Sequence, residues 1–223
     1  MSSFEFSGFS KHFGLLPGDR VAIVGTGGKT ALMDQLADEN AAKGVLIAPT
    51  TRIGTDQIKQ RTGVSYLGRM EGDKFAAAPL DEIEAAAQNY SLTLMEADGS
   101  KGLPLKGWAV HEPIVPAFAT VTIGVIPVQA LGLTANDNTV HRLPLFREQT
   151  GLSAGDAVTG AALSRMILWC VERYSMGRRV IFINQVDSEE QLAAARQIVR
   201  ELRNFDGLVL MGSAREGILW NES

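Results

Sequence analysis

A glycine-rich turn between an apolar segment and a helix-forming segment is the feature that most limits what this chain can fold into. Residues 21–30 read Val-Ala-Ile-Val-Gly-Thr-Gly-Gly-Lys-Thr, which predicts a strand, a tight turn and a helix start in direct succession. Such a turn lets backbone N–H groups converge on a phosphate at the helix N-terminus. Lys29 is expected to neutralise phosphate oxygens and Thr30 to place its hydroxyl on Mg²⁺. The predicted phosphate loop comprises Gly25, Thr26, Gly27, Gly28, Lys29 and Thr30; a glycine turn without a ligand is the alternative.

The loop is shorter than the full Walker pattern G-x-x-x-x-G-K-[ST], because Ile23 occupies the position of the first glycine. The run Gly-Thr-Gly-Gly-Lys-Thr resembles the compact ATP loop of Mur-type peptide ligases and folylpolyglutamate synthases. That resemblance covers the loop alone, and it implies ATP as one candidate nucleotide.

Short β-rich runs alternate with longer Ala-, Leu- and Glu-rich segments over the chain, which is typical of parallel strands joined by covering helices. We therefore expect an α/β fold: a mostly parallel sheet with helices on both faces, in a P-loop NTPase-like three-layer architecture. The expected strands are 20–24, 45–48, 64–67, 92–96, 120–126, 179–183 and 208–211. The expected helices are 29–42, 55–61, 80–88, 157–174 and 188–204, the last capped by Ser188. A long loop is expected at 99–116.

Composition limits the class of protein. The chain has 223 residues with a formal net charge of −4, which favours one domain, residues 1–223, and argues against a nucleic-acid partner. The N-terminal segment does not resemble a secretory signal, and the apolar stretch 120–133 is too short to span a membrane. A lone cysteine, Cys170, excludes an intrachain disulfide and favours the cytoplasm.

An acidic segment follows the expected strand 92–96. Glu96 and Asp98 are two residues apart, so their side chains lie on the same face of an extended chain. A carboxylate at a strand end after a phosphate loop is a common partner of Mg²⁺. Glu96 and Asp98 are therefore candidate metal ligands together with Thr30; which of the two carboxylates contacts the metal is open, and a simple Asp98-Gly99 turn is the alternative.

The loop beyond Gly99 carries charged and aromatic residues. Lys101 and Lys106 are expected to receive an anionic substrate or phosphate, while His111 and Glu112 are candidates for proton transfer or metal ligation. Trp108 lies among them. The predicted catalytic residues are Lys29, Asp98, Lys101, His111 and Glu112. A solvated lysine and a structural histidine are the alternatives.

Three segments together carry a family resemblance over nearly the whole chain. Glu-Ala-Asp-Gly-Ser-Lys-Gly-Leu-Pro-Leu-Lys at 96–106, His-Glu-Pro-Ile-Val-Pro at 111–116 and the glycine-rich turn resemble the YqeC-type selenium-dependent molybdenum hydroxylase accessory proteins. The resemblance implies a P-loop-like nucleotide-binding domain that assists maturation of a molybdenum hydroxylase, with that enzyme or its maturation proteins as partners. Asp137 and the segment 140–142 also resemble a family motif; a site for a phosphorylated substrate and a structural turn are both open for them.

A segment near the C-terminus resembles the base-reading motif of GTPases. Asn184 and Asp187 have the spacing of N-K-x-D, with Gln185 in place of the lysine, and Ser213-Ala214 follows where those proteins carry a Ser-Ala motif. A carboxylate at Asp187 can accept two hydrogen bonds from guanine that adenine does not offer. The predicted base pocket consists of Asn184, Asp187 and Ser213; a turn that caps the next helix is the alternative.

These patterns together predict a protein that binds a purine nucleotide, ATP or GTP, with Mg²⁺. Nucleotide hydrolysis, or phosphoryl or nucleotidyl transfer, is the expected chemistry. An ATP-dependent ligase or kinase acting on a small acid is one alternative, and a non-enzymatic, nucleotide-gated chaperone or delivery module is another. One cysteine and three histidines form no recognisable ligand pattern, so no tightly bound transition metal is expected.

Overall fold

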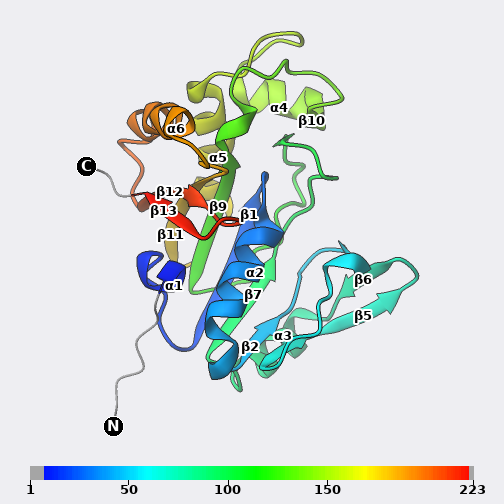
Figure 1. Cartoon of the computed structure of the whole chain (residues 1–223). Coiled ribbons are helices and arrows are strands. Elements are labelled where there is room, and N and C mark those ends of the chain that lie inside the picture. The colour runs from blue at the N-terminus through cyan, green and yellow to red at the C-terminus, as the bar shows by residue number, and fades with distance from the viewer. Residues whose placement is uncertain (1–7, 221–223) are drawn as a thin grey trace.

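A computed structural model describes residues 8–220 of the chain. Its centre is an eight-stranded sheet in the order β13-β12-β11-β9-β1-β7-β2-β4 (Figure 1). Every neighbouring pair is parallel except β12 and β13, which are antiparallel. The sheet strands are β1 (Asp19–Gly25), β2 (Val45–Ile47), β4 (Val64–Tyr66), β7 (Leu92–Glu96), β9 (Val121–Pro127), β11 (Arg178–Asn184), β12 (Leu208–Ser213) and β13 (Ile218–Trp220).

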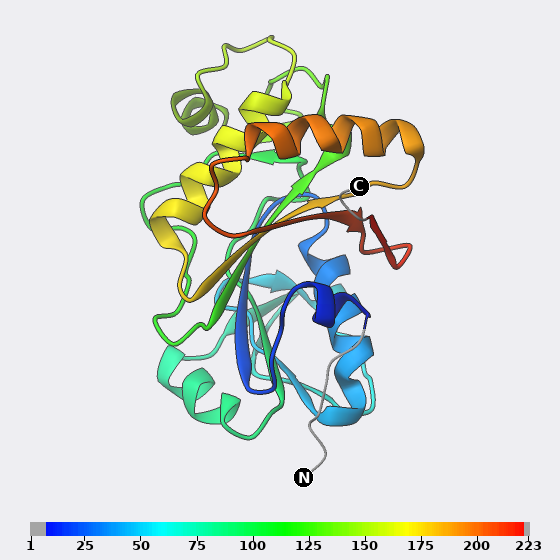
Figure 2. The ribbon, with the colours of Figure 1, turned by 90° about the vertical axis from the view of Figure 1, so that its left-hand side faces the viewer.

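Helices cover both faces of this sheet, as expected for strands that are apolar throughout. The α-helices are α1 (Gly8–His12), α2 (Lys29–Asn40), α3 (Leu80–Ala87), α4 (Leu143–Thr150), α5 (Gly160–Tyr174) and α6 (Glu189–Glu201). Three 3₁₀ helices add η1 (Ala41–Lys43), η2 (Thr55–Gln57) and η3 (Val128–Ala130). Figure 2 shows α1 and α2 on one side of the sheet and α5 and α6 on the other.

Two apolar cores result, one on each face. On β1, Val21 and Ile23 pack into the core beneath α1 and α2, whereas their neighbours Ala22 and Val24 pack into the core beneath α3, α5 and α6. This division follows from the alternation of side chains along a strand. The predicted α/β class with a mostly parallel sheet between helices is confirmed.

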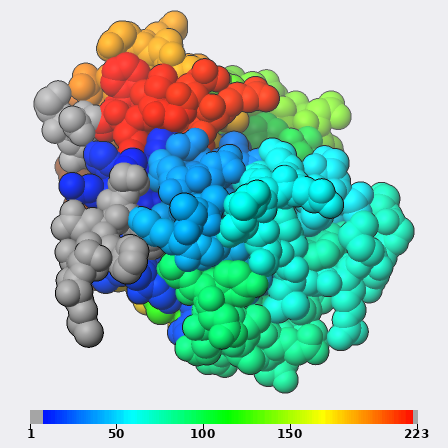
Figure 3. Space-filling view, turned by 60° about the horizontal axis from the view of Figure 1, so that its bottom comes forward, coloured from blue at the N-terminus to red at the C-terminus, as the bar shows by residue number. Residues whose placement is uncertain are grey.

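Two small sheets lie outside the main one. The first has the order β3-β6-β5, formed by β3 (Ile53–Gly54), β5 (Gly68–Glu71) and β6 (Lys74–Ala77). The second pairs β8 (Leu105–Lys106) with β10 (Val140–His141) in parallel. The space-filling view in Figure 3 shows the segment of the first small sheet, in cyan, beside α2, in light blue.

Most predicted elements are present, with some differences. The helix expected at 55–61 is only the short η2, and Arg61 instead forms an ion pair with Asp34 on α2. The helix expected from residue 157 starts at Gly160, because Ala157 bridges to Thr134 and the Thr159 hydroxyl caps the helix. Helix α4, strand β13 and both small sheets were not predicted. They are short segments, and their periodicity is too weak to be recognised.

Candidate functional site

The glycine-rich turn joins β1 to α2 at the carboxyl edge of the sheet, and its glycines are required by close contacts. Gly25 has φ 102°, and a Cβ there would lie 2.2 Å from the carbonyl oxygen of Val125. Gly28 has φ 109°, and a Cβ there would lie 2.4 Å from Nδ2 of Asn184. A side chain at either position would therefore displace the turn from the ends of β9 and β11.

Lys29, the first residue of α2, is buried and held by its own loop and by two acids. Its Nζ donates to the carbonyl oxygen of Gly25 at 2.8 Å and lies 3.3 Å from Asp98 and 3.6 Å from Glu96. Burial lowers the pKa of Lys29, but the two carboxylates outweigh it, so the pKa is raised above its ordinary value. The ammonium group therefore stays charged beside the loop.

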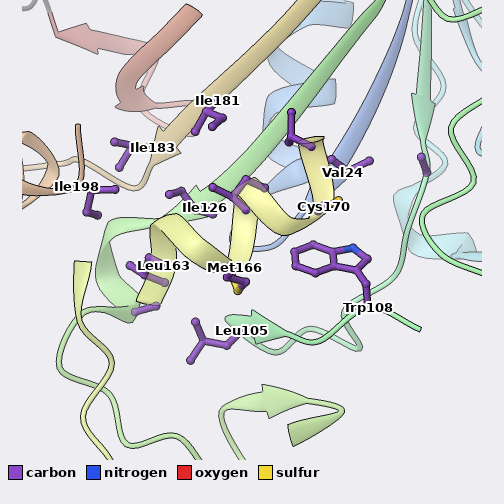
Figure 4. Packing of buried hydrophobic residues seen from close by; sticks show 14 of the residues in the cluster. Val24, Leu105, Trp108, Ile126, Leu163, Met166, Cys170, Ile181, Ile183 and Ile198 are labelled. Atoms are coloured by element: carbon purple, nitrogen blue, oxygen red, sulfur yellow. The ribbon is translucent and has the colours of Figure 1, made fainter. Parts of the chain in front are cut away.

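Asp98 is fully buried, and both of its carboxylate oxygens are hydrogen-bonded. They accept from the Gly25 N–H at 3.2 Å each, and Oδ2 also accepts from Trp108 Nε1 at 2.7 Å and from Lys106 Nζ at 3.1 Å. Trp108 is 1% exposed and packs beside Cys170 of α5 (Figure 4). The sequence left open whether Asp98 or Glu96 would contact a metal; in the structure Asp98 lies behind the loop, where it contacts Gly25 of β1 and Lys106 of β8.

Glu96 faces the cavity that the loop opens onto. It is 7% exposed, and its Oε2 is buried with no hydrogen-bond partner among the described residues. Burial raises the pKa of Glu96, opposed by Lys29. Thr30 lies in the same cavity wall, where its Oγ1 donates to Gln57 Oε1 at 3.0 Å. An unpartnered carboxylate oxygen and a hydroxyl are oxygen donors of the kind that Mg²⁺ prefers.

A row of alternating charges leads from Lys29 and Asp98 to Arg142. Lys106 is fully buried and contacts both Asp98 and Glu112, the latter at 2.7 Å. Glu112 in turn accepts two hydrogen bonds from Arg142, at 2.7 and 3.0 Å. Burial would raise the pKa of Glu112, but hydrogen bonds from Arg142 and Lys106 outweigh it and lower the pKa to about 2. The predicted anion-binding role of Lys106 does not match this buried position, because its charge is already shared by two carboxylates.

The cavity has a volume of about 790 Å³. Five cationic and three acidic side chains line it, although the whole chain has a formal net charge of −4. The cations are Lys29, Arg52, Lys74, Lys101 and Arg142, and the acids are Asp56, Glu96 and Glu112. No Phe, Tyr or Trp is among the lining residues of the described chain. The wall is therefore suited to an anionic ligand more than to an apolar one.

The three residues of the predicted base pocket do not line this cavity, and Asn184 is the one that contacts the loop among the described residues. Asn184 Nδ2 donates to the Gly27 carbonyl oxygen at 2.8 Å, and its Oδ1 accepts from the Ala214 N–H at 2.9 Å. Asp187 is exposed and accepts from Gln129 Nε2 at 3.1 Å. Ser213 Oγ accepts from the Glu216 N–H at 3.3 Å. Asn184 thus anchors the glycine-rich loop to β11 and to the turn after β12.

Other predicted residues lie apart from the cavity or only at its rim. His111 and Asp137 are exposed and do not line it, whereas Lys101 is exposed and does. Sequence reasoning missed Arg52, Gln57 and Lys74, which reach the cavity from the β3-β6-β5 segment. No motif marks these three residues, because an unpredicted small sheet brings them to the site.

Within 8–220, no group of three or more His, Cys, Asp or Glu residues is placed to hold a metal ion. No helix in the same range is long and apolar enough to cross a membrane.

Comparison with known proteins identifies the family. The family model described as "YqeC protein" matches residues 21–144, which is more than half of the 223 residues. The chain belongs to the YqeC family. The chain is also 28% identical over 221 residues to "Uncharacterized protein YqeC" of Escherichia coli (strain K12), an alignment that covers 83% of each protein. The matched range of the YqeC model contains the glycine-rich loop and every member of the charge row from Lys29 to Arg142, whereas Asn184 and Asp187 lie beyond it.

Proposed function

We propose that this YqeC protein binds a purine nucleoside triphosphate together with Mg²⁺ at the loop 25–30. The observation that carries the proposal is a glycine turn at the start of α2 that opens, with a buried Lys29, onto a cavity lined by Glu96, whose buried Oε2 has no hydrogen-bond partner among the described residues. Backbone N–H groups at a helix start and a lysine ammonium are the groups that hold nucleotide phosphates.

In this proposal each residue of the site has a separate role. Lys29 exchanges its contact with the Gly25 carbonyl oxygen for phosphate oxygens, and Thr30 and Glu96 supply protein oxygens to Mg²⁺. Bound Mg²⁺ would neutralise negative charge on the phosphate oxygens. Asp98 keeps Lys29 charged and holds the loop against β7 without touching the metal.

Transfer to a second substrate is favoured over simple hydrolysis, because cations also line the part of the cavity away from the loop. The reaction would then be a phosphoryl or nucleotidyl transfer, and a ligase or kinase acting on a small acid belongs to the same class. A nucleotide-gated delivery module without turnover is the non-enzymatic alternative. The role of the nucleotide in maturation of a selenium-dependent molybdenum hydroxylase rests on the family resemblance of the three sequence segments.

The test is calorimetric titration of the purified chain with ATP and with GTP, each with and without Mg²⁺, together with a phosphate-release assay. Lys29→Ala should abolish measurable binding, and Thr30→Val should remove the Mg²⁺ dependence. The matched control is Lys11→Ala, which deletes an exposed lysine on α1. Unchanged nucleotide affinity in both loop variants would disprove the proposal, while binding without turnover would favour the delivery module.

The maturation role needs a separate test in cells. Deleting the gene should lower the activity of a selenium-dependent molybdenum hydroxylase without lowering the amount of its polypeptide, and the wild-type gene, but not the Lys29→Ala variant, should restore it. Full hydroxylase activity in the deletion strain would argue against this role while leaving nucleotide binding untouched.

A further inference from the structure

We propose that Lys101, His141 and Arg142 form a second subsite of the cavity, which binds the phosphate group of a small phosphorylated molecule. Lys101 follows β7, His141 ends β10, and Arg142 stands between β10 and α4, and all three line the cavity. A reaction between this molecule and the nucleotide rests on the proposed function. Binding of the molecule to the second subsite is independent of the proposed function.

The second subsite is separate from the phosphate loop. From Lys29 to Arg142, the contacts run through three intervening charged residues, of which Asp98 and Lys106 are buried behind the cavity lining and Glu112 lines the cavity. Lys29 and Arg142 nevertheless border the same cavity of about 790 Å³. When an anionic ligand is bound at Lys29, the guanidinium group of Arg142 is therefore still available to bind a second anion.

Arg142 keeps unused donors toward a ligand. A guanidinium carries five N–H groups, and Glu112 accepts one hydrogen bond from each of Nη1 and Nη2. The remaining N–H groups have no hydrogen-bond acceptor within residues 8–220, and the side chain is 26% exposed. A guanidinium in this state can bind a further oxyanion through its fork.

Lys101 adds a second charge. It is exposed at the cavity rim and forms no ion pair or hydrogen bond with the described residues through its ammonium group. Glu112 is already shared between Lys106 and Arg142. The second subsite therefore has a positive excess that a phosphate monoester, which carries two negative charges on one group, compensates better than a single carboxylate group, even one that belongs to a dicarboxylate.

Backbone strain gives independent support. Three non-glycine residues in the described range have positive φ: Lys101 (53°), Arg142 (63°) and Gln185 (65°). All three line this cavity. Side-chain-bearing residues adopt the left-handed region at a cost in free energy, and such residues cluster at ligand sites. Two of the three are the cations of the second subsite.

His141 provides a probe of occupancy. Burial lowers the pKa of His141, the charges of Arg142, Lys106 and Lys101 lower it further, and Glu112 opposes them. A phosphate dianion beside Lys101 and Arg142 would offset these cations. The pKa of His141 should therefore rise when the second subsite is filled.

The experiment is an NMR titration of the histidine side chains in the full chain, with His141 assigned by a His141→Gln variant. Glycerol 3-phosphate and inorganic phosphate are the phosphate probes, and succinate is the carboxylate control. We expect both phosphate probes to raise the pKa of His141 by about one unit, whether or not Lys29 is replaced by Ala. Succinate should have a much smaller effect.

Two variants test the cations. Lys101→Asn removes a charge and places at φ 53° a residue type that tolerates the left-handed region; Arg142→Lys retains the charge but loses the fork. Each should weaken glycerol 3-phosphate binding about tenfold. The control Arg203→Asn deletes an exposed arginine after α6, outside the cavity lining, and should have no effect.

Several results would overturn the second subsite. They are an unchanged glycerol 3-phosphate affinity in both cation variants, an equal response to succinate, and loss of the His141 response on Lys29→Ala alone, which would place the phosphate at the loop. If the chain binds no nucleotide but keeps the His141 response, the proposed function fails and the second subsite stands.

Discussion

The two carboxylates after β7 should behave in opposite ways when their charge is removed. Asp98 is fully buried with four donor groups around its carboxylate, among them the Nζ atoms of Lys29 and Lys106. Replacing Asp98 by Asn leaves two buried ammonium groups with less compensation. Removing one partner of a buried ion pair typically costs about 3–5 kcal/mol, so we expect Asp98→Asn to lower the free energy of unfolding by roughly that amount.

Glu96→Gln should leave the fold intact. The pKa of Glu96 is raised mainly by burial, so the folded state holds this proton more tightly than the unfolded state. Its ionisation therefore costs stability as the pH rises from the unfolded pKa through the folded pKa. A neutral Gln removes that cost, and the free energy of unfolding at pH 7 should be unchanged or slightly higher. The same variant should weaken Mg²⁺-dependent nucleotide binding, because the unpartnered oxygen is lost.

Urea unfolding followed by circular dichroism measures the free energy of unfolding of each variant. Calorimetric titration with nucleotide, with and without Mg²⁺, measures the Mg²⁺ dependence of binding. Asp98→Asn should have a lower urea midpoint, and nucleotide should raise that midpoint if the loop still forms. The reasoning would be refuted by a stable Asp98→Asn protein that has lost Mg²⁺ dependence, together with a Glu96→Gln protein that has kept it. That pair of results would identify Asp98 instead of Glu96 as the Mg²⁺ ligand, which is the other alternative left open by the sequence.

Three further predictions concern the loop, the charge row and the base. Gly28→Ala should abolish nucleotide binding and destabilise the fold more than Gly132→Ala, since both glycines have positive φ but only Gly28 lacks room for a Cβ; equal urea midpoints for the two would contradict this. The pKa of Glu112 is lowered to about 2 from an ordinary 4.5, which is worth about 1–2 kcal/mol once solvent screening of this partly exposed group is allowed for, so Glu112→Gln should be less stable than wild type at pH 7, with the difference vanishing as the pH falls from about 5 through 2. Asp187→Asn should reduce a preference for GTP over ATP in calorimetric titration if Asp187 reads the base, and an unchanged GTP:ATP ratio of affinities would leave it a turn residue.

Local sequence signals were sufficient for the central fold. The apolar runs of β1, β7, β9 and β11 are buried on both faces of a parallel sheet, so they stand out from their surroundings. The β3-β6-β5 sheet is different: β5 is largely exposed and β3 has only two residues. Such strands lack an apolar pattern. The pairing of β3 with β6 joins residues about twenty positions apart, so Arg52 and Gln57 could not be placed at the site from the sequence. The β5–β6 hairpin is local, and its two-residue turn Gly72-Asp73 is the signal that could have marked the position of Lys74.

Of the charged residues in the loop after β7, those that are fully buried do not face the cavity. In an irregular segment, no sequence pattern shows which residues are buried. Lys101 and Lys106 looked equivalent in the sequence, yet Lys101 is exposed at the cavity rim whereas Lys106 is fully buried against Asp98 and Glu112. The difference arises because residues 105–106 pair with β10 as strand β8, which carries Lys106 inward beside Trp108. A loop has no period from which that inward turn could be predicted. The same pairing places His141 and the following Arg142 at the cavity. One short strand pair therefore buries Lys106 behind the cavity lining and positions Arg142 as a cation of that lining.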